Sequence, residues 1–410
     1  MKRLIALILV IIVTLSFVPV YAQDTKSESN ETQFLKTVGV LEAGFSENSK
    51  ITKGEFTKRI VNLLYPDVDF SALNAEGAFN DVNESTKDAS YIKAAKDLGI
   101  VNGNTSNMFY ADSNISSVDA VVIACNALGY SIYAKELGGY PTGYMTVASN
   151  NQLTKGLSYM DEIDGLYMAK LLYNVLFLFP AKIESISVDG ITISENRINV
   201  LETVYNIKKY DAILWDNGVS SVDGVSLGDE ERCIFLISSD NTYISAYAGS
   251  TDISGHLGSR MNVYIFYDEL KGRSEIVKYT IHSASEEYMI NADRIIKFDE
   301  NGIEFEKEGN SGKTEKISFK NSLPPILLNG VIYAGYDINA LIPDDGFIRV
   351  PVNGGDIPLV EIISFNIYAN GVKGKARNIV VDTFDMEEGY INCRLSPENS
   401  LKFEESDTIR

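Results

Sequence analysis

Lys53 is the side chain of this sequence whose position most suggests binding chemistry. It stands in the stretch Ile51-Thr52-Lys53-Gly54-Glu55-Phe56, where Thr52 and Glu55 have the spacing of a capping box and predict the start of a helix. A cation in the first turn of a helix opposes the helix macrodipole, so a lysine is locally unfavourable there. Its ammonium could bind an anionic ligand through a charge-assisted hydrogen bond, or it could be an ordinary solvated lysine.

The residues that usually support catalysis do not form a recognisable pattern. His256 and His282 have no metal-ligand spacing with each other or with Cys233, and no nucleophile elbow, phosphate loop or dinucleotide fingerprint occurs. A glycosidase needs only two carboxylates at the right separation, and the chain has 56 acidic residues, so a hydrolase stays open. The short turns of the second half favour binding or structure, and we expect no enzyme activity, cofactor or metal.

The helix start that contains Lys53 has two further copies. Candidate N-caps stand at Thr52, Ser116 and Asp164, each preceded by an isoleucine. Acidic partners follow three positions after the first two caps, at Glu55 and Asp119. Apolar spacing predicts a helix over residues 53–64. An asparagine lies eleven positions after each isoleucine, at Asn62, Asn126 and Asn174, and we expect these asparagines to serve packing between repeats. The sequence therefore predicts three units of helix, loop and capped helix.

The N-terminus has the pattern of a secretory signal peptide. Lys2 and Arg3 precede an apolar run, and Val20-Tyr21-Ala22 is a small-residue cleavage pattern. We expect cleavage after Ala22, no membrane span in the mature chain, and a polar, flexible leader over residues 23–33.

Composition disfavours some classes of partner and argues against disulfide bonds. The net charge of −20 becomes −22 when Lys2 and Arg3 are removed, which disfavours nucleic acids and anionic membranes as partners. Three cysteines, odd in number and far apart, argue against a disulfide framework in an exported chain; they are Cys125, Cys233 and Cys393.

Several segments of the first half resemble the S-layer homology module. They are Phe79-Asn80-Asp81-Val82, Tyr91-Ile92, Leu98-Gly99-Ile100-Val101-Asn102-Gly103, Phe109 and the capped helix after Ile115. The stretch from Ile51 to Phe56 resembles the isoleucine-threonine-arginine-alanine-glutamate motif of that family. Three copies then cover residues 34–78, 79–138 and 139–176, of which the third is degenerate.

The resemblance implies an all-α pseudo-trimer whose grooves bind secondary cell-wall polysaccharide. In that family the basic residue of the motif binds an acidic sugar substituent, commonly a pyruvate ketal. By position this residue is Lys53, whereas Ser117 and Gly165 replace it in the other repeats. In that family a tryptophan near the start of the repeat also helps to bind the sugar, and this sequence has no tryptophan at that place. The candidate polysaccharide contacts carried over from the resemblance are Lys53, Glu55, Asp81, Tyr91 and Gly103.

The second half has the pattern of an all-β region. After an expected linker over residues 177–185, residues 186–410 alternate apolar and polar positions between turn pairs such as Asp189-Gly190 and Asn329-Gly330. We expect small barrels or a sandwich, in one or two subdomains. The stretch Asn353-Gly354-Gly355-Asp356 has too few carboxylates for a calcium loop, so we expect a plain turn there.

These features favour an exported protein of a Gram-positive-type envelope, anchored to wall polysaccharide and displaying a β-rich structural or binding region. Other envelope proteins are further candidate partners. The alternatives are a wall-associated hydrolase with catalytic carboxylates in the β region, and an interaction scaffold whose repeats no longer bind polysaccharide.

Overall fold

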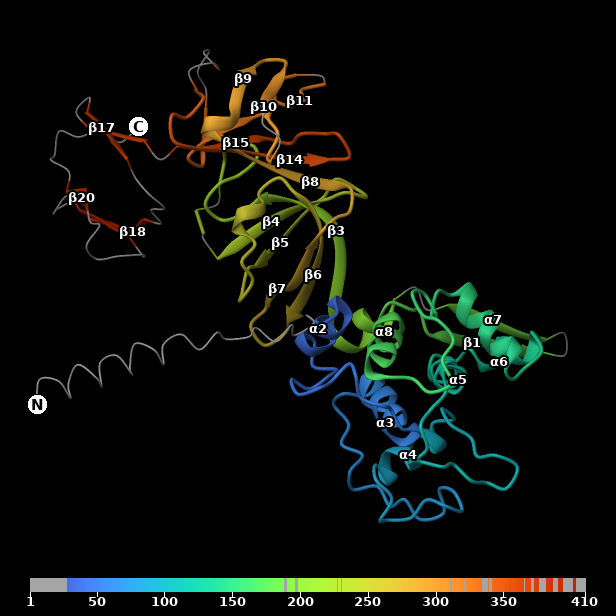
Figure 1. Cartoon of the computed structure of the whole chain (residues 1–410). Coiled ribbons are helices and arrows are strands. Elements are labelled where there is room, and N and C mark those ends of the chain that lie inside the picture. The colour runs from blue at the N-terminus through green and yellow to red at the C-terminus, as the bar shows by residue number, and fades with distance from the viewer. Residues whose placement is uncertain are drawn as a thin grey trace, which may run out of the picture. The chain divides into compact units, whose positions relative to one another are not determined.

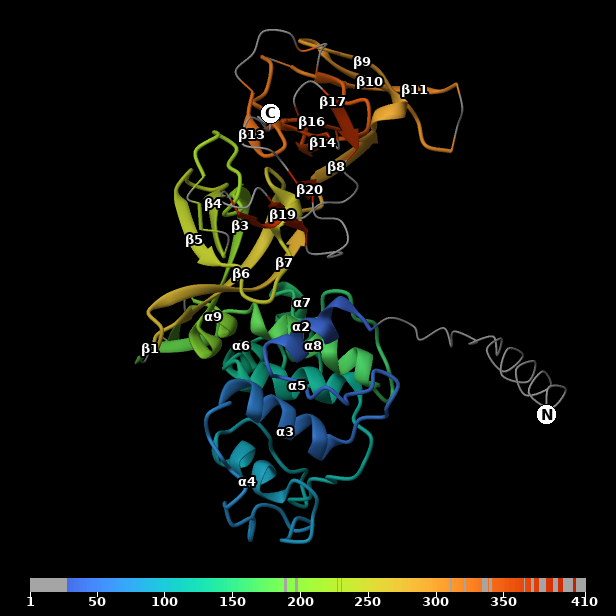
Figure 2. The ribbon, with the colours of Figure 1, turned by 90° about the vertical axis from the view of Figure 1, so that its left-hand side faces the viewer.

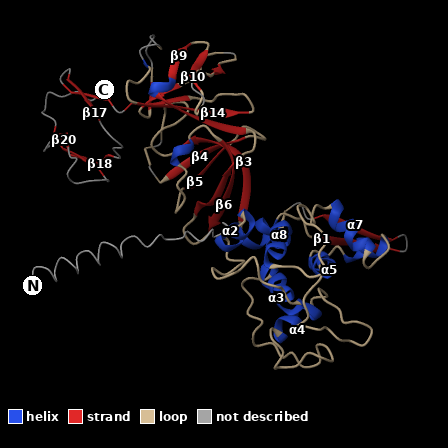
Figure 3. Ribbon diagram, viewed as in Figure 1, coloured by secondary structure: helices blue, strands red, loops and turns tan. Residues whose placement is uncertain are grey.

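The chain divides into two compact units, Met1–Val200 and Leu201–Arg410, in a computed structural model (Figure 1). Helices dominate the first unit and strands the second (Figure 3), which confirms the predicted order of helical and β-rich regions. The structure describes residues 28–402 except for 188–189, 196–197, 227, 230, 310–311, 321, 334–337, 339–340, 365, 370–371, 376–380, 386–389 and 394–400. The expected signal peptide and most of the leader lie outside the described residues.

Two kinds of helix make up the first unit. Three capped helices are α3 (Lys53–Leu64), α5 (Ser117–Ala127) and α8 (Gly165–Leu176). Another helix precedes each of them: α2 (Asn30–Thr37), which Ser29 caps, and α4 (Ala89–Asp97) and α7 (Thr142–Asn150), whose N-cap residues form no side-chain capping bond. A short additional helix, α6 (Ser131–Glu136), lies between α5 and α7. The predicted range of α3 agrees with the observed one.

The capped helices begin where their N-cap side chains accept a backbone N–H. Thr52 accepts from Glu55 at 3.2 Å, Ser116 from Asp119 at 3.1 Å, and Asp164 from Tyr167 at 2.8 Å. Each bond satisfies one of the amides that a helix start leaves without a partner.

A cyclic set of backbone hydrogen bonds joins the three helix starts. Ile115 N–H donates to Ile51 O (3.0 Å), Ile163 N–H to Ile115 O (2.9 Å), and Ile51 N–H to Ile163 O (3.4 Å). All three isoleucines are buried. The three repeats therefore meet around one point, where each contacts both of the others.

The first helix of each repeat packs on the capped helix of the preceding repeat. In this way α4 packs on α3, α7 on α5, and α2 closes the set by packing on α8. Figure 2 shows α3 and α4 as neighbours in blue and teal. Sequence periodicity identifies the apolar face of a helix but not its partner, so this exchange between repeats was not predicted.

Two of the asparagines of the capped helices, Asn126 and Asn174, form hydrogen bonds within their own repeats, which was not expected. Asn126 Nδ2 donates to Ile100 O (3.0 Å) and Asn174 Nδ2 to Leu153 O (2.8 Å). Both carbonyls belong to the same repeat as the asparagine and follow its first helix, so these bonds act within a repeat. Asn126 also has the expected role between repeats, because its side-chain oxygen accepts a hydrogen bond from the Tyr144 hydroxyl of the third repeat (2.9 Å).

Two segments expected to be irregular are structured. Helix α2 begins at Asn30, inside the expected leader, because Ser29 caps it and Glu47 accepts hydrogen bonds from Ser29 and Thr32. Strand β1 (Ala181–Ser187) begins inside the expected linker and pairs with β2 (Gly190–Glu195). The Ala181 N–H donates to Leu128 O (2.8 Å), so this hairpin is part of the first unit.

The second unit begins with a small closed barrel. After helix α9 (Val200–Tyr205), its strands are β3 (Ile207–Asp216), β4 (Arg232–Ile237), β5 (Tyr243–Tyr247), β6 (Arg260–Asp268) and β7 (Arg273–Ile281). They pair in the order β3-β4-β5-β7-β6, and β6 returns to β3. Alternating inward side chains fill the interior, among them Leu214, Phe235 and Val263.

Two more sheets follow the barrel and share a core that includes Phe298, Phe305 and Ile348. The first has the order β13-β12-β15-β14-β8; its strands are Val331–Ile332, Ile326–Leu328, Val360–Ser364, Gly346–Asn353 and Ser285–Asn291. The second has the order β11-β10-β9, formed by Thr314–Ser318, Gly302–Glu306 and Ile295–Asp299 (Figure 2). Asn329 and Gly330 both have positive φ in the two-residue turn between β12 and β13, as their sequence predicts.

Short antiparallel pairings occupy the C-terminal part. β16 (Asn366–Ala369) pairs with β17 (Val372–Lys375), and β18 (Val381–Asp385), β19 (Tyr390–Cys393) and β20 (Leu401–Lys402) form a three-stranded sheet. The stretch from Asn353 to Asp356 is a turn, with Asn353 N–H donating to Asp356 O at 2.8 Å. In the residues described, no three His, Cys, Asp or Glu side chains gather as a metal site would require.

Candidate functional site

Three equivalent junctions surround the cyclic hydrogen bonds of the first unit. At each of them, the first residue of a capped helix donates its N–H to the loop that precedes the next capped helix. The first junction joins Lys53 to Ser113 O (2.9 Å), the second joins Ser117 to Met160 O (3.1 Å), and the third joins Gly165 to Ser49 O (2.9 Å).

Lys53 presents its ammonium at the first junction. The Lys53 Nζ lies 4.8 Å from the centroid of the Phe109 ring, within the range of a cation–π contact. Phe109 is buried and stacks on Phe79 at 5.1 Å between ring centroids. Among the described residues, no carboxylate lies within ion-pair distance of this ammonium. The cation is therefore held in place by an aromatic ring and remains able to pair with an anion.

Asp81 fixes the loop on which Phe109 lies. Its carboxylate accepts the N–H of Phe109 (2.8 Å) and of Tyr110 (2.7 Å). Burial acts to raise the pKa of Asp81, but these two amides and the nearby Lys53 charge outweigh burial and lower it. Asp81 therefore stays ionised and, although the sequence resemblance assigns it to ligand binding, its oxygens already hold the loop beside Lys53.

Tyr110 is a residue of this site that sequence reasoning missed. Its backbone is left-handed, with φ of +61°, and its side chain is 51% exposed. Its position directly after the buried Phe109 was the only sequence signal, because the left-handed conformation depends on the tertiary contact with Asp81.

The other predicted contacts lie at different places. Tyr91, on α4, is under the Lys58 ammonium (5.1 Å to the ring centroid), and Lys58 also pairs with Asp88 at 2.8 Å. Gly103 gives the loop room, because a Cβ there would approach the Phe79 ring and the Asn107 Cα at 3.0 Å. Glu55 contributes the backbone N–H that Thr52 caps. The structure thus brings together Lys53 and Asp81.

The second and third junctions are filled by the protein itself. At the second, the Ser117 hydroxyl donates to Met160 O (2.9 Å) and accepts from Met160 N–H (3.0 Å). At the third, a Cβ on Gly165 would overlap the Ser46 carbonyl oxygen. Neither junction has a side-chain cation at this position, and the third has no space for one.

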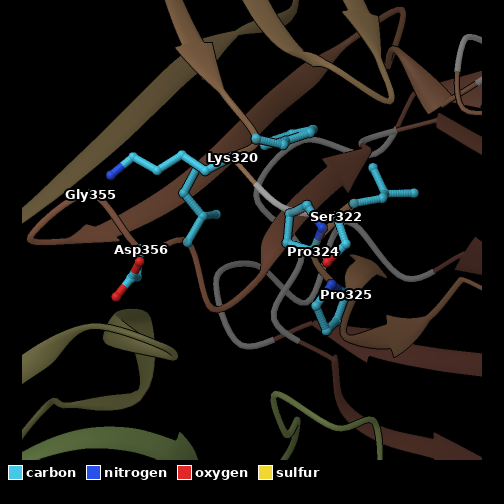
Figure 4. Close-up of a pocket in the computed structure, with 9 residues that line it drawn as sticks. Lys320, Ser322, Pro324, Pro325, Gly355 and Asp356 are labelled. Atoms are coloured by element: carbon cyan, nitrogen blue, oxygen red, sulfur yellow. The ribbon is translucent and has the colours of Figure 1, made fainter.

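The second unit contains two small cavities beside the turn from Asn353 to Asp356. One, of about 220 Å³, is lined by residues that include Lys320, Pro324 and Gly355; Figure 4 shows the Lys320 side chain extending toward Gly355. The other, of about 270 Å³, includes Arg260. Both are smaller than typical sites for drug-sized ligands.

The partly buried carboxylates of Glu287 and Glu361 in the second unit are engaged by the buried Arg349. Arg349, 4% exposed, pairs with Glu361 (2.8 Å) and Glu287 (3.1 Å), and His256 Nδ1 lies 2.9 Å from Glu287. Burial acts to raise the pKa of Glu287, but His256, Ser259 and Arg349 lower it overall. A glycosidase acid needs a raised pKa, so Glu287 has the opposite electrostatic setting.

Comparison with known proteins matches one segment of the first unit to a family. Residues 78–116 match the family described as S-layer homology domain, so the chain contains such a domain. The matched region includes Asp81, Phe109 and Tyr110 and ends at the Ser116 cap; Lys53 precedes it.

One relative covers much more of the chain. A protein of Thermoanaerobacter kivui named "Cell surface protein" is 24% identical over 324 residues, which are 75% of this chain and 40% of that protein. The chain thus spans less than half of the relative's length. The two comparisons together support a cell-surface protein that contains an S-layer homology domain. No helix in the described part of the chain is long and apolar enough to cross a bilayer.

Proposed function

We propose that the first unit attaches the protein non-covalently to secondary cell-wall polysaccharide, with its three repeats arranged as the pseudo-trimer of the S-layer homology family. The observation that carries this proposal is the Lys53 ammonium, which lies on the Phe109 ring without a carboxylate partner among the described residues. A cation held in this way can pair with an acidic sugar substituent such as a pyruvate ketal, and the bond is charge-assisted.

The first junction is the principal binding site in this proposal. Ser117 is bonded to Met160 and Gly165 lies against Ser46, so in this proposal the acidic substituent is bound at the first of the three junctions. A lysine offers a point charge where arginine offers a planar fork. Recognition of the sugar must therefore come from groups around Lys53 as well.

The second unit is displayed by this attachment and has a structural or binding role without catalysis. The engagement of Glu287 and Glu361 by Arg349 supports this assignment. We propose that the chain is exported to a Gram-positive-type envelope by cleavage after Ala22. Other envelope proteins are its candidate neighbours there.

Co-sedimentation with purified wall sacculi tests the attachment. We expect the mature chain to sediment with native sacculi and to remain in solution when the secondary polymer has been stripped. Equal binding to both preparations would assign the interaction to peptidoglycan, and binding to neither would favour a scaffold whose repeats have lost the polysaccharide.

A further inference from the structure

Tyr110 combines three properties that a purely structural loop residue would not need. Its φ of +61° places a bulky side chain in the left-handed region, which costs about 1–2 kcal/mol for residues other than glycine. Its ring is half exposed. Within the described residues its hydroxyl forms no hydrogen bond. Strained residues of this kind cluster at ligand sites.

The backbone of Tyr110 is fixed relative to Lys53 by consecutive hydrogen bonds. Asp81 Oδ2 accepts the Tyr110 N–H at 2.7 Å. Tyr110 O accepts the Ser113 N–H (3.1 Å), and Ser113 O accepts the Lys53 N–H (2.9 Å). The left-handed turn thereby separates two adjacent aromatic side chains: Phe109 is buried under the Lys53 ammonium, whereas Tyr110 remains exposed at the same junction.

The other two junctions lack this aromatic side chain. At the third junction, Ser46 stands at the position of Tyr110. The Leu166 N–H donates to Glu47 O as the Gly54 N–H donates to Ala111 O, so Glu47 corresponds to Ala111. The residues directly before them therefore correspond as well. At the second, Leu157 stands three residues before Met160, as Tyr110 stands three before Ser113. The second junction has an exposed aromatic ring of its own, Tyr159, but among the described residues it has no cation beside it, so an exposed ring and an open cation occur together at the first junction.

We propose that the Tyr110 ring is the stacking platform for one pyranose ring of the bound glycan, and so determines that Lys53 binds an acidic group carried on a sugar. The proposal rests on the proposed function of the same site. An aromatic face offers a rigid apolar surface for the C–H groups of a sugar, while the ammonium binds the acidic substituent.

Three substitutions at position 110 separate binding from folding. Glycine and asparagine both tolerate a left-handed backbone, so Tyr110→Gly and Tyr110→Asn should leave the melting temperature unchanged or higher. Without the ring, we expect both to bind purified wall polysaccharide about tenfold more weakly than the mature parent chain. Tyr110→Trp should stay within about threefold of the parent. The exposed Tyr159 of the second junction supplies the matched control, because Tyr159→Ala should not change the affinity.

The outcomes distinguish this inference from the proposed function. If Lys53→Ala weakens binding while Tyr110→Gly binds as tightly as the parent, then the sugar does not stack on Tyr110, but the proposed attachment to wall polysaccharide is still supported. A loss of affinity that tracks a loss of melting temperature in all three variants would assign Tyr110 a structural role and overturn the platform. Absence of binding by the parent chain contradicts both.

Discussion

The three junctions of the first unit share one backbone arrangement and differ in what occupies the first position of the helix. The Lys53 ammonium lies over the Phe109 ring, and the Ser117 hydroxyl is hydrogen-bonded to Met160. Gly165 has no side chain, so the Ser46 carbonyl lies close to the helix. The repeated hydrogen bonds therefore preserve the fold at every junction, whereas binding chemistry depends on one side chain. Repeats with the same backbone arrangement therefore need not have the same binding site.

The third junction should be the most sensitive to an added side chain. Gly165→Ala places a Cβ against the Ser46 carbonyl, and overpacking of this kind costs about 1–3 kcal/mol. In an exposed helix the same change would stabilise by up to about 1 kcal/mol, so the sign of the effect is diagnostic. A cost of about 2 kcal/mol lowers the melting temperature by about 4–8 °C in a domain of this size.

Circular dichroism of the full mature chain at 222 nm measures this shift. Ser117→Ala is the matched control at the second junction, where the lost hydroxyl bonds to Met160 should cost about 1 kcal/mol. An unchanged or higher melting temperature for Gly165→Ala would mean that the third junction has room for a side chain, and the contrast between the junctions would fail.

Asp81 should make the first junction sensitive to acid. Its pKa is lowered from the ordinary value of 3.8, so its stabilising contribution is complete above about pH 4 and is lost as the pH falls through the folded-state pKa. We expect Asp81→Asn to destabilise the chain by about 1–2 kcal/mol at pH 6, since an amide accepts these two N–H bonds less well. The difference from the parent should shrink below pH 4.

Melting temperatures of parent and variant between pH 3 and 6 check the Asp81 prediction. Asp112→Asn, an exposed carboxylate in the same loop, should show no such pH-dependent difference. A constant gap between Asp81→Asn and the parent across this range would rule out titration of Asp81 as its cause.

Local signals in the sequence account for the parts of the fold that were predicted. A capping residue and an apolar stripe specify α3 from Lys53 to Leu64 without reference to the rest of the chain. The docking of α2 on α8, by contrast, joins the two ends of the first unit. The start of α2 was placed too late because its cap depends on Glu47, eighteen residues after Ser29.

The candidate site was predictable to a similar degree. Motif position identified Lys53 and Asp81, which the structure brings together around Phe109. Tyr91 and Gly103 have their contacts with Lys58 and with Phe79 instead. Tyr110 was not found, because only the carboxylate of Asp81, distant in sequence, holds its backbone in the left-handed conformation.

The affinity of Lys53→Ala for purified wall polysaccharide tests the central claim most directly. A charge-assisted hydrogen bond contributes about 1.5–3 kcal/mol, so titration calorimetry at moderate salt should find binding weakened by about tenfold or more. Helicity should not change, because Thr52 still caps α3. Lys50→Ala removes the same charge three residues earlier, from an exposed pair with Glu162, and should alter the affinity by less than about twofold. If Lys53→Ala binds the polymer as tightly as the parent chain, the first junction is not the binding site.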